Sequence, residues 1–224
     1  MKRILYWPGM GQQKDILKHL RDELSKENII DFIDFDYDKD ELDPSKWNIL
    51  KNKYDWWIGI SLGASLLYYS YNFLKEEYRP KRITIINPFS SRKKLSEERN
   101  FDLSNQWNFM PKEQNINIEI IDLISSVYDS KIPMYHGIEL LNDTNSKEKN
   151  LIFVNGGHTI DDSNAQIELA QILLNTAMHI YFSSSVNPSK AFLANSFCAF
   201  IPSLIMDSAL FNITISICFL FRAL

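Results

Sequence analysis

Glycine is scarce in this chain of 224 residues, with only 7 in all. Because glycine is the residue that tolerates sharp turns and close backbone approach, the few that are present mark special positions. Most of them fall in two short motifs that follow apolar runs, one with Gly9 and Gly11 and the other with Gly59 and Gly63. We therefore expect functional backbone geometry at these two motifs.

Cysteine is rarer still, with 2 residues, Cys198 and Cys218, both late in the chain. They form neither the spacing of metal ligands nor a disulfide framework, so we expect no metal and an intracellular protein. The N-terminus also lacks the apolar stretch and cleavage site of a signal peptide. A cytoplasmic location is the expectation.

Positive charge is in slight deficit, with a formal net charge of −4. This balance disfavours a nucleic-acid-binding surface that covers the molecule. The hydrophobic fraction of 45% and the charged fraction of 23% are those of an ordinary globular protein. A chain of this length forms one substantial core.

Apolar runs typical of buried strands alternate with segments whose apolar residues have helical spacing. The predicted strands are 4–7, 29–35, 56–60, 82–88, 116–124 and 151–154. The predicted helices are 14–26, 44–52, 62–78, 134–141 and 161–177. Continuous apolar strands between helices indicate the α/β class, with a mostly parallel central sheet and helices on both faces.

Two segments interrupt this alternation. Residues 90–114 are charged at first and aromatic later, and a loop of this length between strands is usually functional or disordered. Residues 183–224 are strongly apolar. Their stretch 203–221 approaches the length of a membrane span, but Asp207 lies inside it, and a charge there costs about 2.5–3.5 kcal/mol. A membrane-contacting tail, a buried extension and an unrelated added tail are the alternatives.

The motif Gly59-Ile60-Ser61-Leu62-Gly63 follows an apolar run and precedes a helical pattern. Gly-x-Ser-x-Gly in this context is typical of a nucleophile elbow, in which a sharp strand-to-helix turn exposes the serine hydroxyl. The helix that follows directs N–H groups and its positive dipole end at the reaction centre. We predict Ser61 as a nucleophile.

A serine hydroxyl needs a base and an orienting acid, which follow the elbow in the chain order acid and then histidine. Of four histidines, His158 alone lies in a loop directly after a predicted strand, and it is the predicted base. Asp129, after the strand at 116–124, is the first choice for the acid, with Asp122 and Asp143 as alternatives.

An oxyanion needs N–H donors from the residue after the nucleophile and from the loop after the first strand. Leu62 is the first of these. The second loop is Pro8-Gly9-Met10-Gly11, in which the N–H of Met10 is the expected donor.

At these residues the sequence resembles the α/β-hydrolase superfamily, especially its small esterases and thioesterases with little or no cap. The resemblance spans about residues 1–177 and rests on Pro8-Gly9-Met10-Gly11, Gly59-Ile60-Ser61-Leu62-Gly63, Asp129-Ser130-Lys131-Ile132-Pro133 and Gly156-Gly157-His158. Asn87-Pro88 also looks like the small esterases, whereas Trp7-Pro8-Gly9 replaces the family's usual His-Gly. The resemblance implies an acyl-serine intermediate and no cofactor.

The resemblance further divides the chain into a hydrolase domain at 1–182, with a reduced cap at about 90–114, and an apolar extension at 183–224. In the cap, Trp107 and Phe109 are candidates for lining an acyl pocket, with core packing as the alternative. Arg92 opens a basic run that would hold an anionic substrate or an acyl carrier protein, with a solvated face as the alternative.

The main functional hypothesis is a serine hydrolase that cleaves an ester or thioester of a small to medium acyl group. The alternatives are an acyltransferase that uses the same three residues and a non-catalytic binding protein with the same fold. The altered first motif and the apolar tail favour the binding protein, whereas the order of Ser61, Asp129 and His158 favours an enzyme.

Overall fold

The centre of the molecule is one parallel sheet. The computed structural model describes residues 1–11, 16–33, 50, 52–99 and 115–175, together with two short strands at 180–182 and 217–218. The strand order is β2-β1-β3-β4-β5-β6-β7-β8, and every neighbouring pair is parallel. The strands are β1 (Arg3–Trp7), β2 (Ile29–Phe32), β3 (Trp56–Ile60), β4 (Arg82–Ile86), β5 (Asn117–Ser126), β6 (Asn145–Val154), β7 (Ile180–Phe182) and β8 (Ile217–Cys218).

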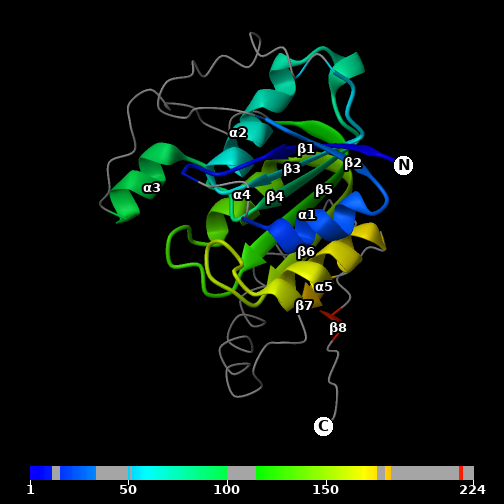
Figure 1. Ribbon diagram of the computed structural model, residues 1–224. Coiled ribbons are helices and arrows are strands. Elements are labelled where there is room, and N and C mark those ends of the chain that lie inside the picture. Colours follow the sequence, from blue (N-terminus) through cyan, green and yellow to red (C-terminus); the bar gives the residue numbers. More distant parts are fainter. Residues whose placement is uncertain are drawn as a thin grey trace.

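Helices cover both faces of this sheet (Figure 1). On one face lie α1 (Lys18–Ser25) and α5 (Ser163–Leu174), packed side by side, and on the other lie α2 (Leu62–Ser70) and α4 (Tyr135–Asp143). A further helix, α3 (Arg92–Arg99), follows β4, and the short 3-10 helices η3 (Tyr71–Phe73) and η4 (Glu76–Tyr78) follow α2. The predicted α/β class, with a parallel sheet between two helical layers, is confirmed.

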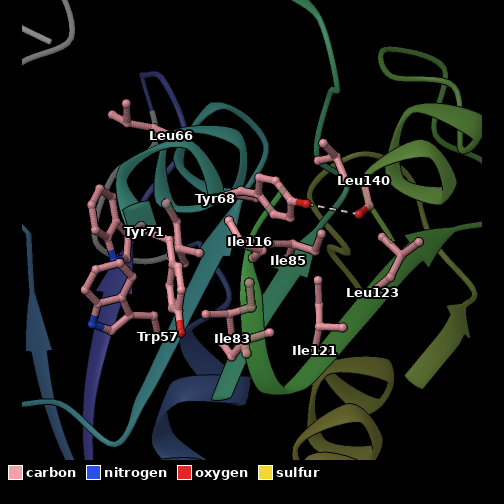
Figure 2. Packing of buried hydrophobic residues seen from close by; sticks show 14 of the residues in the cluster. Trp57, Leu66, Tyr68, Tyr71, Ile83, Ile85, Ile116, Ile121, Leu123 and Leu140 are labelled. Carbon is pink, nitrogen blue, oxygen red and sulfur yellow. Dashed lines mark hydrogen bonds between the residues drawn. The ribbon is translucent and has the colours of Figure 1, made fainter. Parts of the chain in front are cut away.

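The face covered by α2 and α4 carries the larger apolar cluster (Figure 2). Trp57 and Tyr68 are fully buried there, and each large apolar side chain buried in this way contributes about 1.5–3 kcal/mol. The Tyr68 hydroxyl donates to the carbonyl of Leu140 at 3.2 Å, so its burial leaves no polar atom unsatisfied. This contact joins α2 to α4 and fixes the helix that begins after Ser61.

On the opposite face of the sheet, a glutamine of α5 connects α5 to α1. Gln166 is buried, and its Oε1 accepts from the N–H of His19 at 3.0 Å, in the first turn of α1. The start of α1 has no side-chain cap of its own, so Gln166 satisfies an N–H that the helix leaves open. The Gln166 amide also donates to the carbonyl of Ile160 at 2.7 Å, which ties α1, α5 and the loop after β6 together.

The helix predicted at 62–78 is shorter than expected. The α-helix ends at Ser70 and continues as the 3-10 helix η3, which ends where the backbone of Leu74 is extended, with φ −88° and ψ 147°. The Arg79 side chain donates to the carbonyls of Leu74 at 3.0 Å and Asn72 at 3.4 Å. Arg79 therefore stabilises the break with groups that lie outside the helical pattern.

Strand β6 is longer than the apolar run at 151–154 that predicted it. Its first half is polar, but it pairs with β5 from Asn145 onward, so ladder bonds rather than apolar burial extend it. Of the helix predicted at 44–52, all but residues 50 and 52 lie outside the described residues, as does the tail apart from the backbone of β8. No helix in the described part of the chain is sufficiently long and apolar to cross a membrane.

Candidate active site

Loops from neighbouring strands meet at the carboxyl edge of the sheet. Met10 follows β1, Ser61 follows β3, Asn87 follows β4, Asp129 follows β5 and His158 follows β6. Because all these strands are parallel, their carboxyl ends lie on one edge, where ligands bind in open α/β sheets.

The backbone of Ser61 is strained. Its φ of 55° and ψ of −125° are outside the regions that a residue with a side chain prefers, at a cost of about 1–3 kcal/mol. The turn is held because the Ser61 N–H donates to the carbonyl of Ile86 at 2.8 Å and the Ser61 carbonyl accepts from the N–H of Ser65 at 3.1 Å. Strand β4 and helix α2 thus fix the predicted elbow from both sides.

The two glycines of the motif have different neighbours. A Cβ atom at Gly59 would overlap the backbone of Ala64, which lies in the first turn of α2. A Cβ atom at Gly63 would overlap the carbonyl groups of Trp7 and Pro8. Gly59 therefore permits the sharp turn itself, and Gly63 permits the loop after β1 to lie against it.

Three predicted residues form one hydrogen-bonded line. The Oγ of Ser61 lies 2.8 Å from Nε2 of His158, and Nδ1 of His158 lies 2.7 Å from Oδ2 of Asp129. The side chains of His158 and Asp129 are only 9% and 4% exposed, so water competes little for the bond between them. The structure brings Ser61, His158 and Asp129 together as the sequence order predicted.

Asp129 is anchored by its own loop. Its Oδ1 accepts from the N–H groups of Lys131 at 2.8 Å and Ile132 at 2.9 Å. Hydrogen bonds from backbone N–H groups to a carboxylate are strong, so they fix this side chain with its other oxygen toward His158.

The alternative acids make other contacts. Asp122 is fully buried in β5 and forms an ion pair with Arg82 at 2.8 Å, and it also accepts from Thr84 and Asn150. Arg82 in turn donates to the carbonyl of Leu173 at 2.8 Å, at the end of α5. Asp122 thus joins strands to a helix, and Asp143 ends α4. Neither alternative takes the place of Asp129 at His158.

A residue to which the sequence assigned no role lies behind the histidine. The Nδ2 of Asn87 donates to the carbonyl of His158 and to Oγ of Ser126, both at 2.8 Å, while its Oδ1 accepts from the N–H of Ser126 at 2.8 Å. Asn87 is buried and has a φ of 47°. Its amide therefore connects the ends of β4 and β5 to the loop that carries His158. The only sequence signal was the pair Asn87-Pro88 at the end of a strand.

The predicted oxyanion donors lie beside Ser61. Leu62 is the first residue of α2, so its N–H has no partner within the helix. Both Leu62 and Met10 line the same cavity as Ser61 and His158. The loop that carries Met10 lies against the elbow because Gly63 leaves room for it.

The cavity has a volume of about 570 Å³, the size of a small-molecule site. Most of its walls are apolar, and the lining includes Met10, Ile16, Leu62, Phe89, Leu95 and Ile132. Arg92 is buried at the start of α3 and is not among the described lining residues, whereas Arg99 of the same basic run is. The other predicted pocket residues, Trp107 and Phe109, lie outside the described residues.

Comparison with solved structures decides the fold. An esterase domain from a Rhodothermus marinus protein has a TM-score of 0.60 at 13% identity, with 77% of this chain and 84% of that chain covered. The chain has the α/β-hydrolase fold.

Two further structures with this α/β-hydrolase fold are similar to the same extent. A thioesterase from the prodiginine biosynthetic pathway of Streptomyces coelicolor has a TM-score of 0.59 at 14% identity, covering 79% of this chain and 90% of that one. A monoacylglycerol lipase from Paleococcus ferrophilus has a TM-score of 0.59 at 12% identity, covering 77% and 92%. No protein-family model and no curated protein sequence matches the chain.

A second histidine, His136, also contacts a serine. Nδ1 of His136, in α4, lies 2.8 Å from Oγ of Ser90, which donates to Glu139 at 2.5 Å. Ser90 and His136 are both fully buried, and burial lowers the pKa of His136 although Glu98 and Glu139 act against it. Lys94 of α3 forms an ion pair with Glu139 at 2.6 Å, so this cluster fastens α3 to α4.

The sequence also contains His19 and His179. His19 lies in α1 on the far side of the sheet from α2, and His179 lies outside the described residues. Across the described ranges, no three His, Cys, Asp or Glu side chains gather where they could hold a metal ion.

Proposed function

We propose that this protein is a serine hydrolase that cleaves an ester or thioester of a small to medium acyl group. The observation that carries the proposal is the line from Ser61 Oγ through His158 to Asp129, with bonds of 2.8 Å and 2.7 Å, at the wall of a cavity. A serine hydroxyl needs this arrangement of base and orienting acid before it can attack a carbonyl.

In the first step, Ser61 Oγ attacks the carbonyl carbon of the substrate and its proton passes to Nε2 of His158. Asp129 accepts the Nδ1–H of His158 and stabilises the imidazolium that forms. The carbonyl π electrons move to the oxygen, which becomes an oxyanion. The N–H groups of Leu62 and Met10 are the donors that would stabilise this charge.

Collapse of the tetrahedral intermediate expels the alcohol or thiol, which takes the proton from His158, and leaves an acyl group on Ser61. Water then attacks the acyl-serine with His158 as base, and release of the acid restores the free hydroxyl. Every proton transfer uses Nε2 of one histidine, whose position is fixed by Asp129 on one side and by Asn87 behind it.

The cavity supports the size and character of the substrate that we propose. A volume of about 570 Å³ with apolar walls suits an acyl chain of small to medium length. The esterase, thioesterase and lipase names of the structurally similar proteins support the choice of ester or thioester bonds. At 12–14% identity they support this class of reaction and no particular substrate.

A fluorophosphonate probe tests the proposal, because it labels only an activated serine and needs no knowledge of the substrate. We expect stoichiometric labelling of the wild-type protein at Ser61, located by peptide mass spectrometry, and none in Ser61→Ala. Ser90→Ala is the matched control, because Ser90 also contacts a histidine but is buried away from the cavity. A folded wild-type protein that the probe does not label would refute the proposal and favour a non-catalytic binding protein.

A further inference from the structure

Two positively charged side chains line the cavity that contains Ser61. Arg99 comes from the last turn of α3, and Lys131 comes from the loop after β5. Both are exposed to solvent. Among the described residues, no Asp or Glu lines this cavity. The described lining of the cavity is therefore positively charged, although the whole chain has a net charge of −4.

Two other cations of α3 lie close to carboxylates. Lys94 pairs with Glu139 at 2.6 Å, and Lys93 lies 4.0 Å from Glu97. Within the described part of the chain, neither Arg99 nor Lys131 forms an ion pair. Two cations from separate elements thus share a cavity without a counter-charge from its walls.

Both cations stand on fixed backbone. The Lys94–Glu139 ion pair and the contact of Ser90 with Glu139 hold α3 against α4. The N–H of Lys131 donates to Asp129, so the loop of Lys131 is held by the same carboxylate that contacts His158. The backbone positions of Arg99 and Lys131 relative to Ser61 are therefore set by the fold.

We propose that Arg99 and Lys131 bind an anionic group of the substrate, a carboxylate or a phosphate, while the apolar walls hold the adjoining carbon chain. This rests on the proposed function, since it takes the cavity of Ser61 to be the place where an ester or thioester binds. A guanidinium offers two parallel N–H donors to either anion, and a partly enclosed cavity strengthens the attraction relative to open solvent.

Two parts of a substrate would carry such a charge. One is a carboxylate at the far end of the acyl chain, as in a monoester of a dicarboxylic acid. The other is a phosphate on the leaving group, as in a phosphorylated thiol. Both present the same chemistry to Arg99 and Lys131, and the experiment distinguishes them.

Calorimetric titration with uncleavable ligand pairs tests the proposal. The acyl-side pair consists of the mono-propylamide of glutaric acid, which keeps one free carboxylate, and the neutral compound in which a primary amide replaces that carboxylate. The leaving-group pair is S-butyl pantetheine 4′-phosphate and S-butyl pantetheine. Each ligand is titrated into the wild-type protein, into the Arg99→Gln/Lys131→Gln variant and into the control Lys93→Gln, whose side chain is exposed and outside the cavity lining.

We expect the charged member of one pair to bind about tenfold or more tightly than its neutral partner. This preference shrinks as the ionic strength rises and disappears in the double variant, whereas Lys93→Gln keeps it. The pair that shows the preference identifies the part of the substrate that carries the anion. Equal binding within both pairs, or a preference that survives in the double variant, would overturn the proposal.

The result stands apart from the chemistry at Ser61, because none of the four ligands is cleaved. An anion preference in a protein that the fluorophosphonate does not label would remove the hydrolase function and leave the anion site. Labelling at Ser61 without an anion preference would support the hydrolase function and remove the anion site. Arg99 and Lys131 are exposed, so both substitutions should leave the thermal unfolding midpoint unchanged.

Discussion

Two serine–histidine–carboxylate groups lie in the described part of this molecule, and the serine of only one of them lines the cavity. Ser61, His158 and Asp129 meet at the carboxyl edge of the sheet. Ser90, His136 and Glu139 meet between α3 and α4, with a serine–histidine distance of 2.8 Å in both groups. The distance between serine and histidine therefore does not distinguish them.

The difference lies in what surrounds each serine. Ser61 lines a cavity and precedes the first turn of a helix, and its strained backbone holds the hydroxyl in place. Ser90 is fully buried, and its hydroxyl is occupied by Glu139. The cavity reaches Ser61, and Ser90 is not among the described residues that line it. Access and nearby N–H donors, rather than the three side chains alone, make a catalytic site.

The largest expected effect comes from removing the charge of each carboxylate in turn. Asp129→Asn should lower kcat by about 10⁴-fold, because the amide oxygen stays with the N–H groups of Lys131 and Ile132 and the amide NH2 group then donates to Nδ1 of His158, which forces the wrong tautomer. Glu139→Gln should change kcat by less than about threefold. Steady-state kinetics on an aryl butyrate measure both. Comparable losses in the two variants would erase the distinction between the groups.

A smaller effect is expected from the residue behind His158. Asn87→Gly removes the amide but suits the φ of 47°, so it isolates the side chain from backbone strain. We expect kcat to fall about 10- to 100-fold with little change in KM, because a misplaced base slows the chemical step and leaves binding intact.

Ser126→Ala is the matched control for Asn87→Gly, since it removes a neighbouring contact of Asn87 and keeps the bond to His158. It should retain most of the wild-type kcat. A wild-type kcat in Asn87→Gly would show that the amide does not position the base.

The smallest expected effect is that of pH on the free energy of unfolding, through the buried His136. Burial lowers the pKa of His136, while Glu98 and Glu139 oppose this shift and Lys94 adds to it. In the unfolded chain the pKa of histidine is about 6.5, so below that pH the unfolded state binds a proton that the folded state does not. His136 thus destabilises the fold as the pH falls through 6.5, by at most about 1.4 kcal/mol per pH unit.

Urea unfolding at pH 7.5, 6.5 and 5.5 measures this contribution. The free energy of unfolding should fall less steeply with decreasing pH in His136→Gln than in the wild type. Parallel curves for the two proteins would mean that His136 keeps its unfolded pKa.

Most of the site was predictable because its parts are local. The elbow at 59–63 is specified by five adjacent residues, and His158 and Asp129 each lie in the loop that follows a strand. By contrast, the bonds from Asn87 to Ser126 and His158 join residues 39 and 71 positions apart, and no periodic pattern records them. The ion pair of Arg82 with Asp122 was missed for the same reason.

Helix α3 was missed although a signal was present. The segment was read as polar cap, yet Ser91 stands one residue before the helix and its Oγ accepts from the N–H of Lys94 at 3.3 Å. Serine is a preferred residue at the start of a helix. Ser91 therefore indicates a helix whose last turn carries Arg99, the cation of the basic run that lines the cavity.

The bond between Ser61 and His158 joins residues 97 positions apart, and this separation has a consequence in time. During synthesis at about 5–20 residues per second, the serine leaves the ribosome roughly 5–20 seconds before the histidine. Through that interval the hydroxyl has no base beside it and is as inert as any other serine. Under the proposed function, Ser61 therefore becomes reactive only when β6 joins the sheet and brings His158 into place.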